Sequence, residues 1–143
     1  MVSEISVSAP INSREAVALL EQAMLGLDQV ECPVNEIFAP GVYYREIFMP
    51  AGLVVVGHEH KTKHLNIVLS GRALVTIDGQ TQEIGPGTFV SEAGVRKALV
   101  ILEDMRWATI HPTDETDPKK LEESLITKSE QYFEHTSRKE VTS

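Results

Sequence analysis

Three of the five histidines in this chain of 143 residues, His58, His60 and His64, lie within a seven-residue stretch. Successive side chains of a strand point to opposite faces, so His58 and His60 share a face on a strand that ends near His60. A short turn then brings His64 onto the same interior at the start of the next strand. Imidazoles that converge inside a barrel are ligands for Fe, Ni, Cu, Zn or Mn. The spacing therefore predicts one side of a transition-metal site.

The strands that must position these histidines are predicted between residues 34 and 113. They cover 42–49, 53–60, 65–69, 73–77, 81–84, 88–91, 98–102 and 107–111. Asp78-Gly79 predicts a tight hairpin, because a type I′ turn requires positive φ. Ser70-Gly71 and Glu103-Asp104 also predict turns between strands. Many short strands at close, even spacing predict an antiparallel barrel or sandwich.

Two helices are predicted outside the strands. Residues 1–11 resemble a flexible leader, and Asn12 and Glu15 have the spacing of a capping box that begins a helix reaching about Leu27. Asp117-Pro118 has the residues of an N-cap and first helical position, and predicts a second helix to about Ile126. A polar tail follows. The predicted units are thus 1–30 (leader and helix), 31–113 (barrel) and 114–143 (helix and tail).

Composition excludes several classes of function. The formal net charge of −8 repels phosphate backbones and anionic lipids, so we expect neither nucleic-acid nor membrane partners. The single cysteine, Cys32, cannot form an internal disulfide, which suits a reducing compartment. No basic and apolar targeting segment or membrane-length apolar run is visible. We therefore expect a soluble, cytoplasmic protein.

The histidine region resembles the first motif of the cupin superfamily. That motif is Gly, five residues, His-x-His, three or four residues, Glu, six residues, Gly. Its positions are occupied here by Gly52, His58, His60, His64 and Gly71. Every spacing fits, although His64 stands where the family usually has Glu. The resemblance implies an all-β fold, a cupin jelly-roll β-barrel with the two helices packed outside, and a divalent metal (Fe, Ni, Mn or Zn).

The second cupin motif departs from the family pattern. Lys97 stands where the fourth metal ligand is expected, and a protonated lysine carries no lone pair. Two arrangements could still hold a metal. Either His58, His60 and His64 bind it facially and leave its other positions to water or substrate, or His111 at the end of the last predicted strand supplies a further imidazole.

A narrower resemblance covers roughly residues 33–126. Segments 38–46, 60–67 and 110–117 are similar to a group of small cupins that occur as uncharacterised proteins in phage and bacterial genomes. In that group the matches to His60, His64 and His111 are more typical than the match to His58. This resemblance offers a second possible trio of ligands and implies no particular reaction.

Four further residues are candidates for binding a substrate. Arg96 and Lys97, near the expected barrel mouth, could bind a carboxylate or phosphate, or could be an exposed pair beside a loop. Tyr43 and Arg45 share one strand face, and Tyr44 and Glu46 share the other. One of these pairs must point inward, and the sequence leaves open which.

Together these features predict a metal-binding cupin that forms a homodimer. It is expected to bind or convert a small polar molecule, and an anion is among the candidates. The alternative is a cupin without metal that senses a small molecule or serves in an assembly. No catalytic residue is assigned, because cupins host many reactions and several non-enzymes.

Overall fold

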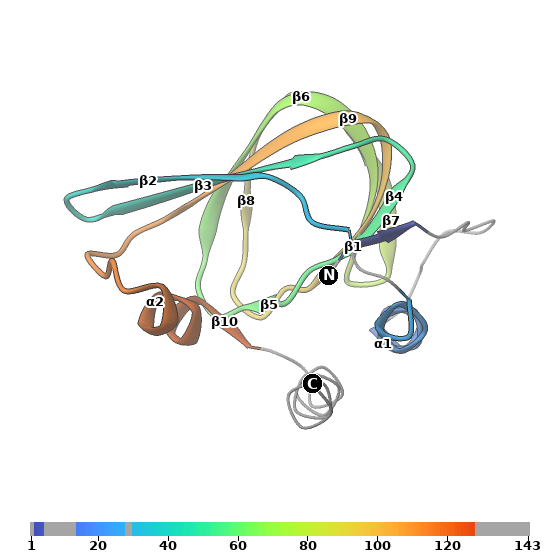
Figure 1. Cartoon of the computed structure of the whole chain (residues 1–143), viewed down its shortest axis with the longest axis horizontal. Coiled ribbons are helices and arrows are strands. Elements are labelled where there is room, and N and C mark those ends of the chain that lie inside the picture. The colour runs from blue at the N-terminus through green and yellow to red at the C-terminus, as the bar shows by residue number, and fades with distance from the viewer. Residues whose placement is uncertain (1, 5–13, 28–29, 128–143) are drawn as a thin grey trace.

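The computed structural model describes residues 2–4, 14–27 and 30–127, which form a curled antiparallel barrel of the jelly-roll type with two helices outside it (Figure 1). The helices are α1 (Arg14–Leu25) and α2 (Pro118–Leu125). The strands are β1 (Val2–Glu4), β2 (Val34–Ala39), β3 (Val42–Met49), β4 (Leu53–Val56), β5 (Glu59–His60), β6 (His64–Ile77), β7 (Gln80–Ile84), β8 (Gly87–Ser91), β9 (Lys97–His111) and β10 (Ile126–Thr127). The predicted all-β jelly-roll is confirmed.

Two long strands, β6 and β9, pair along most of their length and connect the other strands. β9 also pairs with β3 and β4, and β6 with β7 and β8. The turns predicted at Ser70-Gly71 and Glu103-Asp104 are wrong, because both segments lie inside continuous strands. The pairing register shifts between Val68 and Ala73 instead, so the strands bend there without ending.

Glycine is required at this bend. Gly71 has a φ of 90°, and a Cβ at this position would overlap the backbone of Asp104 and Met105 on β9. Gly71, which predicted a turn, therefore allows β6 and β9 to approach each other closely. By contrast, the hairpin predicted at Asp78-Gly79 is present between β6 and β7, and both residues have positive φ (49° and 78°).

The register of β3 shows which of its faces points inward. Tyr43 and Met49 are buried, and Tyr43, Arg45 and Met49 all line the interior cavity described below. Tyr44 and Glu46 point to the opposite face, where Arg106 donates a hydrogen bond of 2.8 Å to Glu46. The Tyr43 and Arg45 pair is therefore the inward one.

The main hydrophobic core fills one part of the barrel. Its members come from β3, β4, β6 and β9: Met49, Leu53, Val55, Val68, Ala73, Val75, Leu99, Ile101, Met105 and Trp107. The amide of Asn66 is fully buried beside this core. Asn66 donates to the hydroxyl of Ser91 (2.8 Å) and accepts from the indole N–H of Trp107 (3.0 Å), which compensates its burial.

Helix α1 packs against the outside of β4. Met24 forms a small cluster with Val54, Val56 and Ala98. Beside it the fully buried carboxylate of Glu21 pairs with the guanidinium of Arg96, which also donates to the carbonyl of Gly57 (2.8 Å). This buried ion pair ties the helix to the barrel.

The C-terminal part of the described chain lies across one end of the barrel (Figure 1). Leu121 and Leu125 of α2 are buried against Tyr43. Strand β10 pairs with β5, where Ile126 is the partner of His60, and the N–H of Lys61 donates to the carbonyl of Leu125 (2.7 Å). The predicted helix is thus present with Pro118 in its first turn, although the Asp117 side chain makes no cap hydrogen bond.

The predicted leader is wrong in part. Val2–Glu4 form β1 and pair with β4, because the free edge of β4 offers backbone partners. The rest of the leader, with Asn12 of the capping box, and the tail beyond Thr127 lie outside the described residues. Neither described helix has the length and the apolar run needed to cross a membrane.

We predict that Glu21→Ala lowers the free energy of unfolding by about 3 kcal/mol, because the Arg96 charge would lose its partner in a largely buried position. Urea denaturation followed by circular dichroism measures the change. The matched control is Glu83→Ala in the exposed pair Arg72–Glu83, which should cost less than about 1 kcal/mol. Equal effects of the two substitutions would contradict the prediction.

Candidate metal centre and ligand cavity

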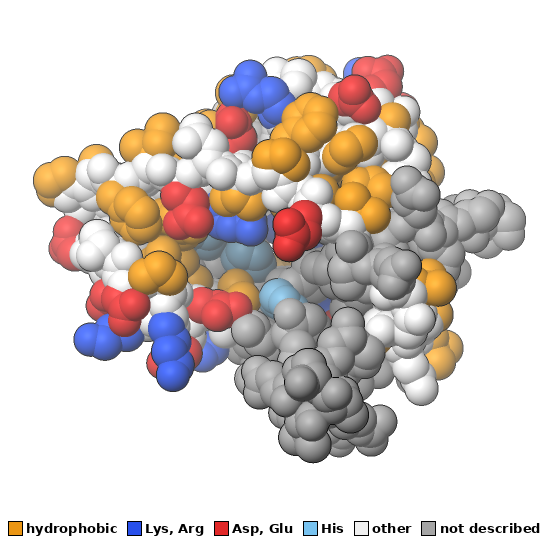
Figure 2. Space-filling model, viewed as in Figure 1, with side chains coloured by type: hydrophobic (Ala, Val, Ile, Leu, Met, Phe, Trp, Pro, Cys, Tyr) orange, Lys and Arg blue, Asp and Glu red, His pale blue; other side chains and the backbone are white. Residues whose placement is uncertain are grey.

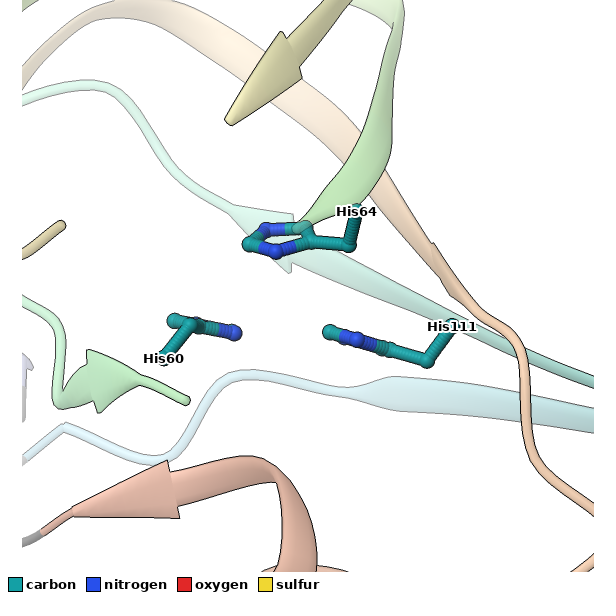
Figure 3. A group of neighbouring side chains, drawn as sticks. All are labelled: His60, His64 and His111. Carbon is teal, nitrogen blue, oxygen red and sulfur yellow. The ribbon is translucent and has the colours of Figure 1, made fainter. Parts of the chain in front are cut away.

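Three histidines from three strands meet at one end of the barrel. They are His60 of β5, His64 at the start of β6 and His111 at the end of β9, and Figure 3 shows their rings pointing toward a common centre. One ring nitrogen from each lies within 4.8 Å of those of the other two. The ring centroids of His60 and His64 are 4.4 Å apart, and those of His64 and His111 4.6 Å. One ion could bridge nitrogens at this spacing after small side-chain rotations.

The hydrogen bonding of the three rings suits a metal. The Nδ1 of His64 lies 3.0 Å from the backbone carbonyl of Thr62, so this nitrogen carries the proton and Nε2 has the lone pair. That Nε2 and the Nδ1 atoms of His60 and His111 are buried and have no hydrogen-bond partner in the described part of the chain. Buried nitrogens without partners are unusual, and a ligating histidine commonly donates its other N–H to a carbonyl. The donor set therefore fits a divalent transition metal.

The surroundings keep these imidazoles neutral. Burial is the largest cause, and it lowers the pKa of His60 to about 3 and that of His111 to about 4. The charges of Lys97 and Arg45 and the neighbouring histidines lower both pKa values further. Burial also lowers the pKa of His64. At neutral pH all three rings are therefore unprotonated, which is the form that binds a metal.

We predict that metal-free protein loses stability as the pH falls from about 6.5 toward 4. In this range the unfolded chain protonates His60 and His111 while the folded chain does not, since their folded pKa values lie below the usual 6.5. The free energy of unfolding should fall by up to about 1.4 kcal/mol per pH unit for each histidine. Urea titrations at pH 7, 6 and 5 in EDTA measure this slope.

The control for the pH prediction is His111→Asn, which removes one of the titrating groups. Carboxylates far from the site titrate equally in both proteins, so the difference between the two slopes reports on His111, together with its effect on the pKa of His60. The variant should have the shallower slope. Identical slopes would show that His111 is protonated in the folded state as readily as in the unfolded state.

The histidines lie beside a cavity of about 530 Å³, a volume typical of small-molecule sites. Figure 2 shows histidine and cationic atoms at the bottom of a hollow bordered by acidic and hydrophobic side chains. Polar residues in its wall include His60, His111, Tyr43, Arg45 and Lys97. The apolar part of the wall comes from the main core and from α2.

Two of the predicted ligand-binding cations face this cavity without a partner. Neither Arg45 nor Lys97 has a side-chain hydrogen bond or an ion pair within the described residues. Burial lowers the pKa of Lys97 to about 8, because its ammonium group is largely withdrawn from water. Both cations also act electrostatically on His60 and His111. Both cations therefore raise the electrostatic potential at the histidine group, although the carboxylates of Glu36 and Glu122 line the same cavity.

Arg96 does not line the cavity, contrary to the prediction. It pairs with Glu21 and with the carbonyl of Gly57 at the outer side of the barrel. Successive residues at the start of β9 point in opposite directions, so Lys97 enters the cavity and Arg96 turns to α1. The sequence offered no sign that Glu21 is buried. Its ion pair with Arg96 links α1 to the barrel and occupies the guanidinium group.

His58 lines the cavity but lies outside the group of three. The predicted strand over 53–60 is interrupted, since β4 ends at Val56 and β5 begins at Glu59. Of the two trios the sequence offered, the structure thus brings together His60, His64 and His111.

The sequence missed part of the cavity wall. Leu121 and Leu125 of α2 line it, and their spacing of four residues was the available signal. Glu36 of β2 lines it too, and accepts a hydrogen bond from the hydroxyl of Tyr43 (3.2 Å). Burial and this carboxylate raise the pKa of Tyr43 to about 12, so the phenol stays protonated.

Comparison with solved structures defines the fold class. The chain is similar to the plu4264 protein of Photorhabdus luminescens (TM-score 0.52, 12% identity, 62% of this chain and 80% of that one). It is also similar to an RmlC-like cupin family protein with a double-stranded β-helix fold from Methanocaldococcus jannaschii (TM-score 0.51, 17% identity, 66% of this chain and 88% of that one). A third similar structure is KdgF from a Halomonas species, with a TM-score of 0.50 and 18% identity over 62% of this chain and 86% of that one.

This protein has the cupin fold. At such low identities the likeness carries the fold alone. No protein-family model matches the sequence, and no curated protein matches it.

Proposed function

We propose that this protein is a metal-binding cupin that binds or converts a small anionic molecule. The observation that carries the proposal is the group formed by His60, His64 and His111. One ring nitrogen from each lies within 4.8 Å of those of the other two, and each ring has a buried nitrogen without a hydrogen-bond partner in the described part of the chain. These three residues would hold a divalent transition metal, which supplies a Lewis acid when bound. Three protein ligands leave further coordination positions for water or a ligand.

The anionic character of the ligand follows from the two unpaired cations. A buried charge without a partner is costly, so a cavity that holds Arg45 and Lys97 favours an occupant of opposite charge. Both side chains donate charge-assisted hydrogen bonds to carboxylate or phosphate oxygens. In this proposal Arg45 and Lys97 bind and orient the anion, Tyr43 lies beside them with its proton retained, and His58 contacts the occupant from another side of the cavity.

The alternative is a cupin that binds its ligand without metal. Lys97 and Arg45 favour this alternative, because the positive potential that lowers the histidine pKa values also repels a metal cation. A bound anion would offset this repulsion. Metal content therefore decides between the two functions.

We predict about one metal ion per chain after incubation with Ni²⁺, Zn²⁺, Fe²⁺ or Mn²⁺. Alanine at His60, His64 or His111 should weaken metal binding by more than about 100-fold, since each removes one of three ligands. Elemental analysis of the purified protein and calorimetric titration with the metal measure these effects.

The matched control for the metal prediction is His58→Ala, which removes a histidine from the same cavity but not from the group of three. It should change metal affinity only a few-fold. If His111→Ala kept its metal content and His58→Ala lost the metal, the ligands would instead be His58, His60 and His64. Absence of metal from the wild type under all four conditions would favour the metal-free alternative.

We further predict that Lys97→Met and Arg45→Met each weaken the binding of malonate or inorganic phosphate to the metal-free protein by about tenfold or more. Each substitution removes a charge-assisted hydrogen bond at nearly constant volume. Calorimetric titration measures the affinities. The control Arg72→Met removes an exposed cation that pairs with Glu83 outside the cavity and should have no effect. A comparable loss in Arg72→Met would show that overall charge, and not the cavity, binds the anion.

Homodimerisation, cytoplasmic location and kinship with the phage and bacterial group stay predictions. The outer face of the sheet supports the first of these. Ile37, Tyr44, Ile110, Leu65 and Val90 are consecutive partners across β2, β3, β9, β6 and β8, and form an apolar row. Ile37, Leu65 and Val90 are each about half exposed.

A further inference from the structure

The wall of the cavity is divided between a charged part and an apolar part. Arg45 and Lys97 supply its positive charge, beside the histidines, and the carboxylates of Glu36 and Glu122 also line the cavity. On the apolar part, Val55 and Leu99 belong to the main core of the barrel, and Leu121 and Leu125 belong to the separate cluster formed by α2. An occupant that reaches the cations is therefore also enclosed by hydrocarbon from three elements, β4, β9 and α2.

The polar groups of the apolar part are mostly engaged with one another. The indole N–H of Trp107 donates to the amide oxygen of Asn66, and the amide nitrogen of Asn66 donates to Ser91. Within the described residues, Thr109 contributes a hydroxyl to this part of the wall without a hydrogen bond of its own. Around Asn66 and Trp107 few groups therefore remain to replace the water that a ligand with many hydroxyls would lose, and burying unpaired hydroxyls is costly.

We infer that the anionic ligand is a carboxylic acid with an apolar body, and not a polyhydroxylated acid of the sugar-acid type. This inference rests on the proposed function, since it concerns the same cavity. The carboxylate contacts Arg45 and Lys97, and the hydrocarbon body lies against Val55, Leu99 and Leu121. The cavity volume of about 530 Å³ has room for a body of several carbons.

The test compares hexanoate with gluconate, because both are six-carbon monocarboxylates and only gluconate carries hydroxyls on its chain. Calorimetric titrations use the EDTA-treated protein and, separately, the Ni²⁺-loaded protein. Hexanoate should bind at least about tenfold more tightly than gluconate to the metal-free protein, since burying two methylenes suffices for such a ratio. The metal-free titration matters because gluconate hydroxyls can also bind a metal directly.

Two substitutions locate the hydrocarbon body. Val55→Thr keeps the shape of a cavity side chain and replaces one methyl group by a hydroxyl, and should weaken hexanoate binding about tenfold while leaving gluconate binding unchanged or improved. Its matched control is Val90→Thr on the outer face, which should change neither. Leu121→Asn makes the same test from α2, outside the barrel core, with the exposed Lys120→Asn as its control. Thermal melting shows which variants fold.

Each outcome separates this inference from the proposed function. Metal binding by the three histidines and malonate or phosphate binding through Lys97, together with equal or tighter binding of gluconate, would overturn the apolar ligand and leave the proposed function standing. Loss of hexanoate binding in Val90→Thr or Lys120→Asn equal to that in the cavity variants would also overturn it. Failure to bind metal and every anion would refute the proposed function itself. The expected preference, sensitive to Val55 or Leu121 alone, supports the apolar carboxylic acid and the anionic ligand of the proposed function, while metal content tests the metal separately.

Discussion

The pairing of β6 with β9 is the constraint on which the rest of the structure depends. β9 begins with Lys97 and ends with His111, and it contributes cavity-lining residues between them. β6 begins with His64 and holds β9 in register through the bend around Gly71. Because one continuous strand carries both the cation and a histidine, the distance between charge and candidate metal centre is set by backbone geometry.

The barrel was predictable from the sequence because its signals are local. Alternation of β-branched residues, the Asp78-Gly79 hairpin and the spacing from Gly52 to Gly71 each depend on a few neighbouring residues. His60 and His64 could be placed near each other for the same reason. The bends in β6 and β9 were not predictable, since a glycine in a turn and a glycine at a strand crossing look the same until the facing strand is known.

The rest of the site depends on contacts between residues far apart in the chain. Whether His58 or His111 joins the other two histidines follows from the register of β9 against β3 and β6. Arg96 and Lys97 are neighbours with the same charge, yet only the position of α1 decides which one is neutralised by Glu21. Leu121 and Leu125 are held at the cavity by their packing against Tyr43 and by the pairing of β10 with β5. Which of these side chains reach the site is decided by packing between distant segments, and local sequence patterns do not reveal that packing.

The close approach at Gly71 also limits how this protein can evolve. A Cβ there would overlap the backbone of Asp104 and Met105, and no rotamer of a larger residue could avoid this, because the clash involves the first atom of every side chain. Substitution of this glycine is therefore excluded unless both strands shift together. A lineage could change this bend only if β6 and β9 moved apart at Asp104 and Met105 in the same step.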